Sequence, residues 1–142
     1  MPEAEAGEST TLAVMLEAVP VEQWQVQRLG IYDWWDGPTA GLCELALPAC
    51  TFWFELWASR FRTDDVDDRL FRPSTLPFSE LGRLWSLLEV PYPAPGQQFS
   101  MERWTARKHQ FDELLAARTA TPLIVRTDDW KHFTAYWRLI KE

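Results

Sequence analysis

Several short motifs that mark enzymes are missing from this sequence. It contains no GxxxxGK[ST] phosphate loop, no GxGxxG dinucleotide motif, no HExxH metal motif, no CxxC pair and no GxSxG nucleophile turn. It also contains no run of about 20 apolar residues, the length that crosses a bilayer. These absences favour a non-catalytic protein that does not enter a membrane, and we expect no bound cofactor.

Cysteine and positive charge are also scarce. The two cysteines, Cys43 and Cys50, have no zinc-ligand spacing and no nearby histidine, so we interpret them as small buried hydrophobic residues and expect no metal site. The net charge of −7, concentrated before residue 100, repels phosphate backbones, so we expect no nucleic-acid partner. The acidic N-terminus is unlike a secretory signal, which predicts a cytoplasmic location.

Tryptophan, in contrast, is abundant, with nine copies in 142 residues. Four of them, Trp34, Trp35, Trp53 and Trp57, fall within 24 positions. An indole ring brings a large rigid contact area and one N–H group that needs a partner when buried. The cluster therefore indicates either an unusually aromatic core or an aromatic surface that binds something.

The hydrophobic pattern predicts an α+β fold in one domain, residues 1–142, with a disordered leader at 1–8 and a proline-rich connector at 90–99. Apolar residues alternate early in the chain and recur at helical spacing later. This order predicts an antiparallel sheet of about 4–6 strands from the N-terminal half, packed by about three helices mostly from the C-terminal half.

The predicted elements follow from turn and cap residues. Residues 11–19 fit a strand or a short helix, and the alternation of Leu12, Val14 and Leu16 favours the strand. Side-chain caps are predicted at Ser74 or Thr75, at Ser100 and at Asp128. The expected strands are 23–35, 40–47, 51–58, a short edge strand at 69–72 and 122–126; the expected helices are 77–89, 101–118 and 129–140. The apolar helix faces are Phe78, Leu81, Trp85 and Leu88; Trp104, Phe111, Leu114 and Leu115; and Trp130, Phe133, Trp137 and Ile140.

Side-chain alternation predicts which residues share a face of the sheet. A two-residue turn at Pro48-Ala49 pairs Cys43 with Phe54 and places both in an apolar core face. A loop with an even number of residues at Asp36-Gly37 keeps the side chains of the preceding strand in phase with these two faces. A loop with an odd number would exchange the faces of that strand. The core face then holds Tyr32, Trp34, Cys43, Leu45, Phe52, Phe54 and Leu56, and the second face holds Ile31, Asp33, Trp35, Leu42, Glu44, Trp53, Glu55 and Trp57.

The second face holds the candidate functional residues. Asp33, Glu44 and Glu55 would lie on adjacent strands and are the candidate catalytic acids, since paired carboxylates serve in acid–base hydrolysis. The candidate binding residues are Trp35, Trp53, Trp57, Glu44 and Glu55, because indole faces stack on ligands and carboxylates fix donors. The alternative is a sheet face partly covered by a helix, with its acids at a wet margin.

Three other features have simpler interpretations than a site. The acidic stretch 63–68 lacks the glycine and distal glutamate of a calcium loop and is interpreted as a solvated loop. His109 and His132 each lie near carboxylates on a predicted helix, which favours local pairing over catalysis. The aromatic face of the last helix is interpreted as core, with a partner contact as its alternative.

The segment 31–45 resembles the opening hairpin of a group of small uncharacterised bacterial proteins. They share a Tyr-Asp-x-x-Asp-Gly-Pro turn, here Tyr32, Asp33, Asp36, Gly37 and Pro38, followed by a strand that contains a cysteine, here Cys43. The resemblance covers about a tenth of the chain and implies a bacterial, cytoplasmic setting without an activity.

Taken together, the sequence favours a non-catalytic module that binds another protein or forms a homodimer. Its support is the aromatic excess, the acidic charge and the missing catalytic motifs. The alternative is a small-ligand binder or hydrolase that uses Asp33, Glu44 and Glu55 beside Trp53 and Trp57.

Overall fold

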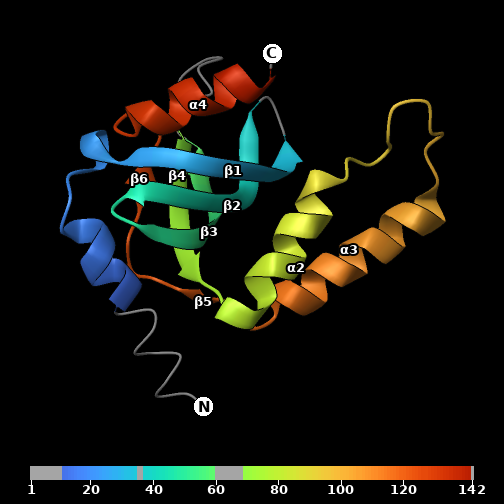
Figure 1. Cartoon of the computed structure of the whole chain (residues 1–142), viewed down its shortest axis with the longest axis horizontal. Coiled ribbons are helices and arrows are strands. Elements are labelled where there is room, and N and C mark those ends of the chain that lie inside the picture. The colour runs from blue at the N-terminus through green and yellow to red at the C-terminus, as the bar shows by residue number, and fades with distance from the viewer. Residues whose placement is uncertain (1–10, 35–36, 60–68, 142) are drawn as a thin grey trace.

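The computed structural model describes residues 11–34, 37–59 and 69–141, and over these the chain is an α+β protein, as predicted (Figure 1). The predicted leader and the acidic stretch 63–68 lie outside these residues. The described strands form one antiparallel, six-stranded sheet in the order β1-β2-β3-β4-β5, with β6 also paired to β4. They are β1 Gln25–Trp34, β2 Pro38–Leu47, β3 Cys50–Ser59, β4 Arg69–Thr75, β5 Thr119–Ala120 and β6 Val125–Arg126.

Helices cover both faces of this sheet. The α-helices are α2 Phe78–Glu89, α3 Met101–Leu115 and α4 Lys131–Lys141, and η1 Val21–Gln23 is a short 3-10 helix. Residues 11–17 are also helical. Among the described residues, no helix combines the length and the apolar composition that crossing a membrane requires.

The first core lies on the face that the sequence assigns to the interior. Cys43, Leu45, Phe52 and Phe54 are at most 2% exposed there. The residues packed over them come from the helical segment 11–17, from Trp24, from α4 and from Trp130 just before it, whose ring stacks on that of Phe133 at a centroid distance of 4.2 Å. The buried members of this cluster are Leu12, Leu16, Trp24, Cys43, Leu45, Phe52, Phe54, Phe71, Val125, Trp130, Phe133 and Trp137.

A second core occupies the opposite face, between the sheet and the pair α2–α3. Leu42 and Trp53 point into it from β2 and β3 and are at most 1% exposed. The helices contribute Leu84, Trp85, Phe111, Leu114 and Leu115. The second face is therefore covered over its central part.

Two predicted elements are wrong near the ends of the sheet. Residues 11–17 form a helix instead of a strand because Leu12 and Leu16, four positions apart, are buried while Val14 is 62% exposed. The predicted edge strand at 69–72 is an internal strand that extends to Thr75. It continues through Pro73, whose carbonyl accepts hydrogen bonds from the backbone N and the Oγ1 of Thr121, both at 2.9 Å.

The helix ends also differ from expectation. Of the predicted caps, only Ser100 is confirmed, and its Oγ accepts from Arg103 N at 3.4 Å. Ser74 and Thr75 belong to β4, and α2 begins after Pro77 without a side-chain cap. Asp128 pairs with Arg126 at 3.4 Å instead. The predicted strand 122–126 is replaced by the two-residue strands β5 and β6, which pair with different parts of β4.

The observed strand pairing differs from the predicted one. In the β2–β3 hairpin the difference leaves every side chain on its predicted face, whereas in β1 it exchanges the faces of two residues. Cys43 is paired with Phe52, two positions from the predicted partner, so each side chain keeps its face. In β1, however, Ile31 pairs with Gly41 and Asp33 with Ala40. Tyr32 is therefore an extra residue in a β-bulge. Ile31 packs on the first core and Tyr32 on the second, the reverse of the prediction.

Candidate functional site

The aromatic residues predicted to bind lie in different environments. Trp53 is 1% exposed, and its ring contacts that of Tyr32 at a centroid distance of 5.6 Å. Trp57 is 57% exposed, with the guanidinium of Arg72 at 4.0 Å from its ring centroid. Trp35 lies outside the described residues. Trp53 and Trp57 therefore do not share one exposed aromatic surface.

Two of the three predicted acids are neighbours, and the third is apart. Asp33 is paired with Ala40, and Ala40 is paired with Glu55, so the two acids flank one position of β2. Glu44 is paired with Thr51, toward the other end of the hairpin. A site that needs all three carboxylates together is thus not formed.

Asp33 and Glu44 each accept a hydrogen bond from a side chain of the β1–β2 hairpin. Asp33 Oδ2 accepts a hydrogen bond from Thr39 Oγ1 at 2.6 Å. Glu44 Oε1 accepts one from Gln27 Nε2 at 3.2 Å. Both contacts are exposed, so water competes with them and they fix the side chains only weakly.

Glu55 has a structural environment. Its Oε1 accepts a hydrogen bond from Trp53 Nε1 at 2.8 Å and lies 2.5 Å from Arg118 Nε. The first contact satisfies the only N–H of a buried indole, which would otherwise be costly to bury. The second joins β3 to the chain just after α3. The carboxylate therefore stabilises the second core at its margin.

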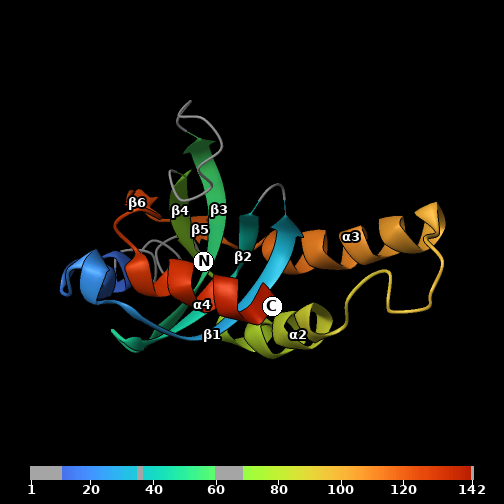
Figure 2. The same cartoon turned by 90° about the horizontal axis from the view of Figure 1, so that it is seen from above.

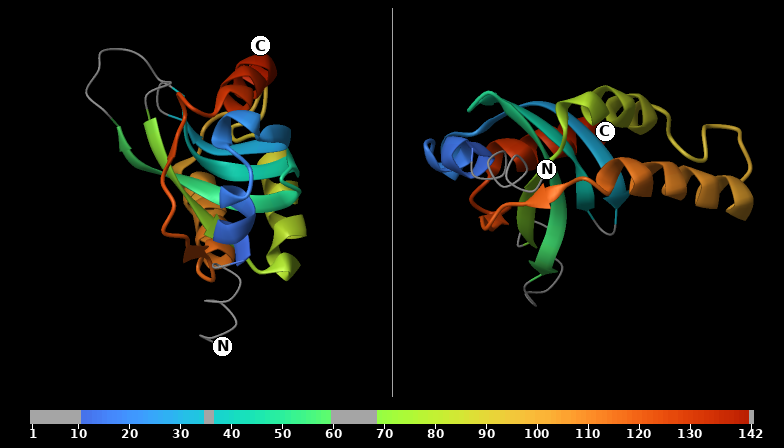
Figure 3. Two further views of the ribbon diagram at one scale, coloured as in Figure 1. Left: turned by 90° about the vertical axis from the view of Figure 1, so that its left-hand side faces the viewer. Right: turned by 90° about the horizontal axis from the view of Figure 1, so that it is seen from below.

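The helix pair α2–α3 carries the most distinctive surface. We call residues 78–115 the arm, which comprises α2, the connector 90–100 and α3. Phe111, Leu114 and Leu115 anchor the last turns of α3 and are at most 5% exposed. The preceding ten residues, 101–110, are exposed apart from the half-buried Arg107. Figures 2 and 3 show this part of α3 extending well beyond the sheet.

Large apolar side chains gather at the outer end of the arm. Phe99 is 56% exposed, Met101 63% and Trp104 43%. We call these three residues the tip. The predicted burial of Trp104 is wrong, because its side chain does not join the second core, in which Phe111, Leu114 and Leu115 are buried. Phe78, at the other end of the arm, is 90% exposed and also departs from its predicted core face.

The connector holds the tip in place with local hydrogen bonds. Tyr92 Oη donates to Ser100 O at 2.7 Å and accepts from Ser100 N at 2.6 Å. Residues 94–97 form a turn in which Gln97 N donates to Ala94 O at 2.8 Å, and Gly96 supplies the positive φ of 81° that this turn needs. The proline-rich connector is therefore an ordered loop.

A cavity of about 550 Å³ lies where the arm meets the hairpin of β1 and β2. Its walls combine aromatic, apolar and charged side chains from β1, β2, the end of α2, the connector and α3. The size falls in the range of about 300–1,000 Å³ that is usual for ligand sites. The lining residues are Ile31, Tyr32, Asp33, Ala40, Leu88, Pro91, Tyr92, Trp104, Arg107 and Lys108.

Charge in the cavity is incompletely compensated. Arg107 lies over the ring of Phe111 at 5.0 Å and Lys108 over that of Trp104 at 5.7 Å. Among the described residues, neither cation has a carboxylate within 4.0 Å. Burial lowers the pKa of Arg107, with nearby Tyr32 opposing that shift. The cavity therefore holds a partly desolvated cation without an anionic partner from the described residues.

Tyr32 lines this cavity close to charges of both signs. Its ring contacts Phe111 at 4.3 Å. Burial raises the pKa of Tyr32, and the negative charges of Asp112 and Asp33 raise it further, while Arg107 opposes them. The phenol thus stays protonated at neutral pH and is a hydrogen-bond donor in the cavity wall.

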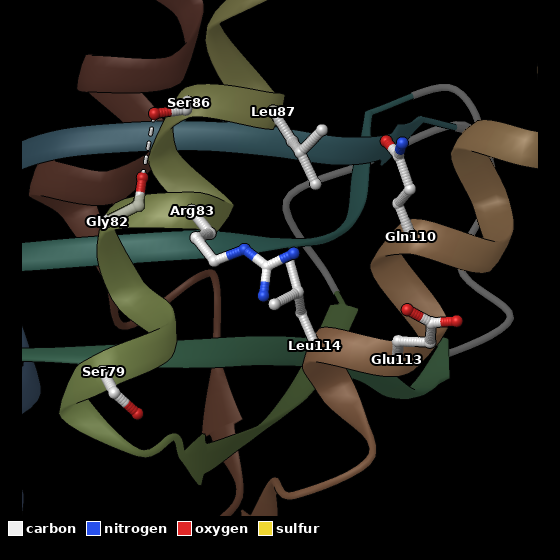
Figure 4. Close-up of a pocket in the computed structure, with 8 residues that line it drawn as sticks. All are labelled: Ser79, Gly82, Arg83, Ser86, Leu87, Gln110, Glu113 and Leu114. Atoms are coloured by element: carbon white, nitrogen blue, oxygen red, sulfur yellow. Dashed lines mark hydrogen bonds between the residues drawn. The ribbon is translucent and has the colours of Figure 1, made fainter.

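A second hollow of about 660 Å³ lies between α2 and α3, on another side of α3 (Figure 4). Gly82 and Ser86 line it from α2, and Gln110 and Glu113 line it from α3. Arg83 reaches from α2 across the opening (Figure 4). All these residues are exposed, so the groove offers space but little desolvated polar chemistry to select a ligand. The cavity is the stronger candidate site.

The remaining predicted candidates lie elsewhere. His109 and His132 are exposed on α3 and α4, and neither pairs with a carboxylate among the described residues. Both cysteines are free thiols; Cys43 is buried, as predicted, whereas Cys50 is only partly buried. Phe133 and Trp137 on α4 and Trp130 just before it are core residues, as predicted, but Ile140 is 47% exposed.

Comparison of the chain with protein-family models, with curated proteins and with solved structures finds no match. Function is therefore argued from the geometry of this chain.

Sequence reasoning missed Arg107, Lys108 and the connector residues of the cavity. A signal was present, since residues 101–110 carry three cations against one carboxylate and follow an uncharged connector in an otherwise acidic chain. Trp104 is the lone aromatic residue among them. A single tryptophan amid cations is typical of a contact surface as much as of a core.

Proposed function

We propose that this protein is a non-catalytic module that binds a partner protein through the arm, as a complex with another protein or as a homodimer. The observation that carries the proposal is the outer part of α3, which exposes a tryptophan, a methionine and a neighbouring phenylalanine away from the sheet. Aromatic residues and methionine are enriched at protein interfaces relative to other surfaces. The bacterial, cytoplasmic setting implied by segment 31–45 belongs to this proposal.

The order of the connector supports a role in recognition. A flexible loop loses conformational entropy when it binds, whereas a loop already held in one conformation avoids much of that loss. Tyr92 and the turn at 94–97 hold the connector, and with it Phe99, in a fixed relation to α3. Helices in proteins are stabilised mainly by packing against other elements, and the first ten residues of α3, which lie outside the core, have little such packing. A bound partner would supply it.

The alternative function, a small-ligand binder or hydrolase on the sheet face, has less support. Trp53 does not present its ring to solvent. Glu55 is engaged by Trp53 and Arg118, and Glu44 lies apart from Asp33. Asp33 alone of the three lines the cavity.

The test is photo-crosslinking in cells of the source organism. A photoreactive amino acid is placed at Phe99, and in a matched control at Leu139, which is 69% exposed on α4. We expect a discrete adduct from position 99 only, with the cross-linked protein binding the purified chain and losing affinity with Met101→Gln and Trp104→Gln. A chain that is strictly monomeric by light scattering and forms no adduct at position 99 would disprove the proposal.

A further inference from the structure

We propose that the cavity between the arm and the β1–β2 hairpin recognises an acidic segment of the partner, with Arg107 and Lys108 receiving a carboxylate and Trp104 and Tyr92 contacting an adjacent apolar side chain. This inference rests on the proposed function, because it names the chemistry of the segment that the arm would bind. Both proposals use Trp104, but this one depends on Arg107 and Lys108, which lie outside the tip, so the two proposals can fail separately.

The Arg107 guanidinium is half-buried near Tyr32 and Phe111, and no described carboxylate lies within ion-pair distance of it. Placing a cation in such a position costs solvation free energy, which an anionic ligand would repay. A guanidinium presents a planar fork of donors that matches both oxygens of a carboxylate.

Lys108 and Trp104 lie one helical turn apart and both line the cavity, with the ammonium 5.7 Å from the indole centroid. Lys108 adds a second positive charge beside Arg107. Trp104 also belongs to the exposed tip, so a segment bound in the cavity would continue over the apolar surface outside it. This continuity favours a peptide over a compact small molecule.

Local charge explains why an acidic segment would bind to an acidic protein. The chain carries −7 overall, whereas residues 101–110 contain Arg103, Arg107 and Lys108 against Glu102 alone, and the connector 90–100 contains no charged residue. Opposite charge across a contact directs encounter and register. The remaining acid of the cavity, Asp33, bonds to Thr39 and is positioned to accept an N–H from the backbone of the same segment.

The test uses the full chain as bait for a random peptide library displayed on phage. We expect the selected peptides to carry aspartate or glutamate beside an aromatic or aliphatic residue. The best peptide, made synthetically, should lose about tenfold or more in affinity with Arg107→Gln, and similarly when its own acids are replaced by amides. Arg107→Lys should lose less, and Lys131→Gln, an exposed cation on α4, should bind as the original chain does.

Each outcome decides the inference. Selected peptides without acids, no selected peptide at all, or full affinity in a folded Arg107→Gln variant would overturn it. Tighter, Arg107-dependent binding of a single-stranded oligouridine would overturn it as well and assign the cations to nucleic acid. If the cross-linked partner still binds Arg107→Gln but not Trp104→Gln, the acidic segment is wrong and the protein-binding function remains.

Discussion

The Tyr92 hydroxyl bonds to both backbone groups of one residue, donating to Ser100 O at 2.7 Å and accepting from Ser100 N at 2.6 Å. This pair closes the connector between α2 and α3 immediately before the helix cap formed by the Ser100 side chain. One phenolic oxygen thus links the middle of the connector to the residue that precedes α3.

Tyr92→Phe should loosen the connector without unfolding the sheet. Hydrogen bonds of this kind contribute about 0.5–1.5 kcal/mol each, so exchange of the Ser100 amide proton should accelerate by about tenfold or more. Tyr136→Phe is the control, because its hydroxyl donates to Gln27 O at 3.2 Å on β1. Hydrogen exchange measured by mass spectrometry or NMR makes the comparison. Unchanged exchange at Ser100 would show that the connector is held by other contacts.

Gly41→Ala should be severely destabilising. A Cβ atom built at Gly41 would lie 2.3 Å from the carbonyl oxygen of Gly30 and 2.9 Å from Phe54 Cζ, so the strands β1 and β2 would have to separate. We expect a loss of at least about 2 kcal/mol in the free energy of unfolding, measured in urea.

Gly82→Ala supplies the matched comparison. A Cβ at this position in α2 meets no atom within 4 Å. Alanine is favoured over glycine inside a helix by about 1 kcal/mol, so this variant should be as stable as the original chain or more so. Equal stability of the two alanine variants would contradict the close approach of β1 and β2.

The environment of Glu55 predicts different effects for two substitutions. Glu55→Ala leaves the indole N–H of Trp53 without an acceptor and should cost about 1–3 kcal/mol. Glu55→Gln keeps an acceptor oxygen and loses only the ion pair with Arg118, whose two side chains are 38–39% exposed, so its cost should be below about 1 kcal/mol. Chemical denaturation followed by tryptophan fluorescence distinguishes them. If both variants lose binding of a ligand while keeping full stability, Glu55 is a functional residue instead.

The two thiols should react slowly and make stability depend on pH. Burial raises the pKa of Cys50 to about 11 and raises that of Cys43 well above its ordinary value of 9.0. At about pH 8, alkylation by iodoacetamide should be slower in the folded chain than in urea, and slowest at Cys43. Mass spectrometry of the two cysteine-containing peptides reports both rates.

Ionisation of Cys50 should lower the stability of the fold as the pH rises. Between about pH 9 and pH 11 the unfolded chain releases the Cys50 proton while the folded chain retains it. The contribution to stability is therefore complete below pH 9 and is lost as the pH rises through 11. Cys50→Ala should show a shallower decline in the free energy of unfolding over this window, and an identical decline would contradict the raised pKa.

The sequence predicted burial correctly where apolar residues alternate clearly along a strand or recur clearly at helical spacing. The alternation around Cys43, Phe52 and Phe54 predicted the first core, and a register error of two positions left that face unchanged. The spacing of Trp130, Phe133 and Trp137 predicted the buried side of α4 and the burial of the residue before it. These patterns are local, and burial of one face follows directly from them.

Other features depended on partners distant in the chain. The bulge at Tyr32 exchanges the faces of two neighbouring residues, and no local pattern marks it. Trp104 and Phe111 are seven positions apart and so lie on the same face of α3. Phe111 is buried, whereas Trp104 is exposed because it lies in the part of α3 that extends beyond the sheet. The cavity joins residues from β1, β2, the end of α2, the connector and α3, so its composition required the tertiary arrangement.

The anchoring of α3 through its final turns has a consequence for how this protein can change over time. Substitutions among residues 101–110 alter side chains that contribute little to folding, whereas substitutions at Phe111 or Leu114 disturb the interior. Under the proposed function, contact with the partner and stability of the fold would depend on successive stretches of one helix. Exchange of the exposed residues would then change specificity and leave the packed residues beneath them intact.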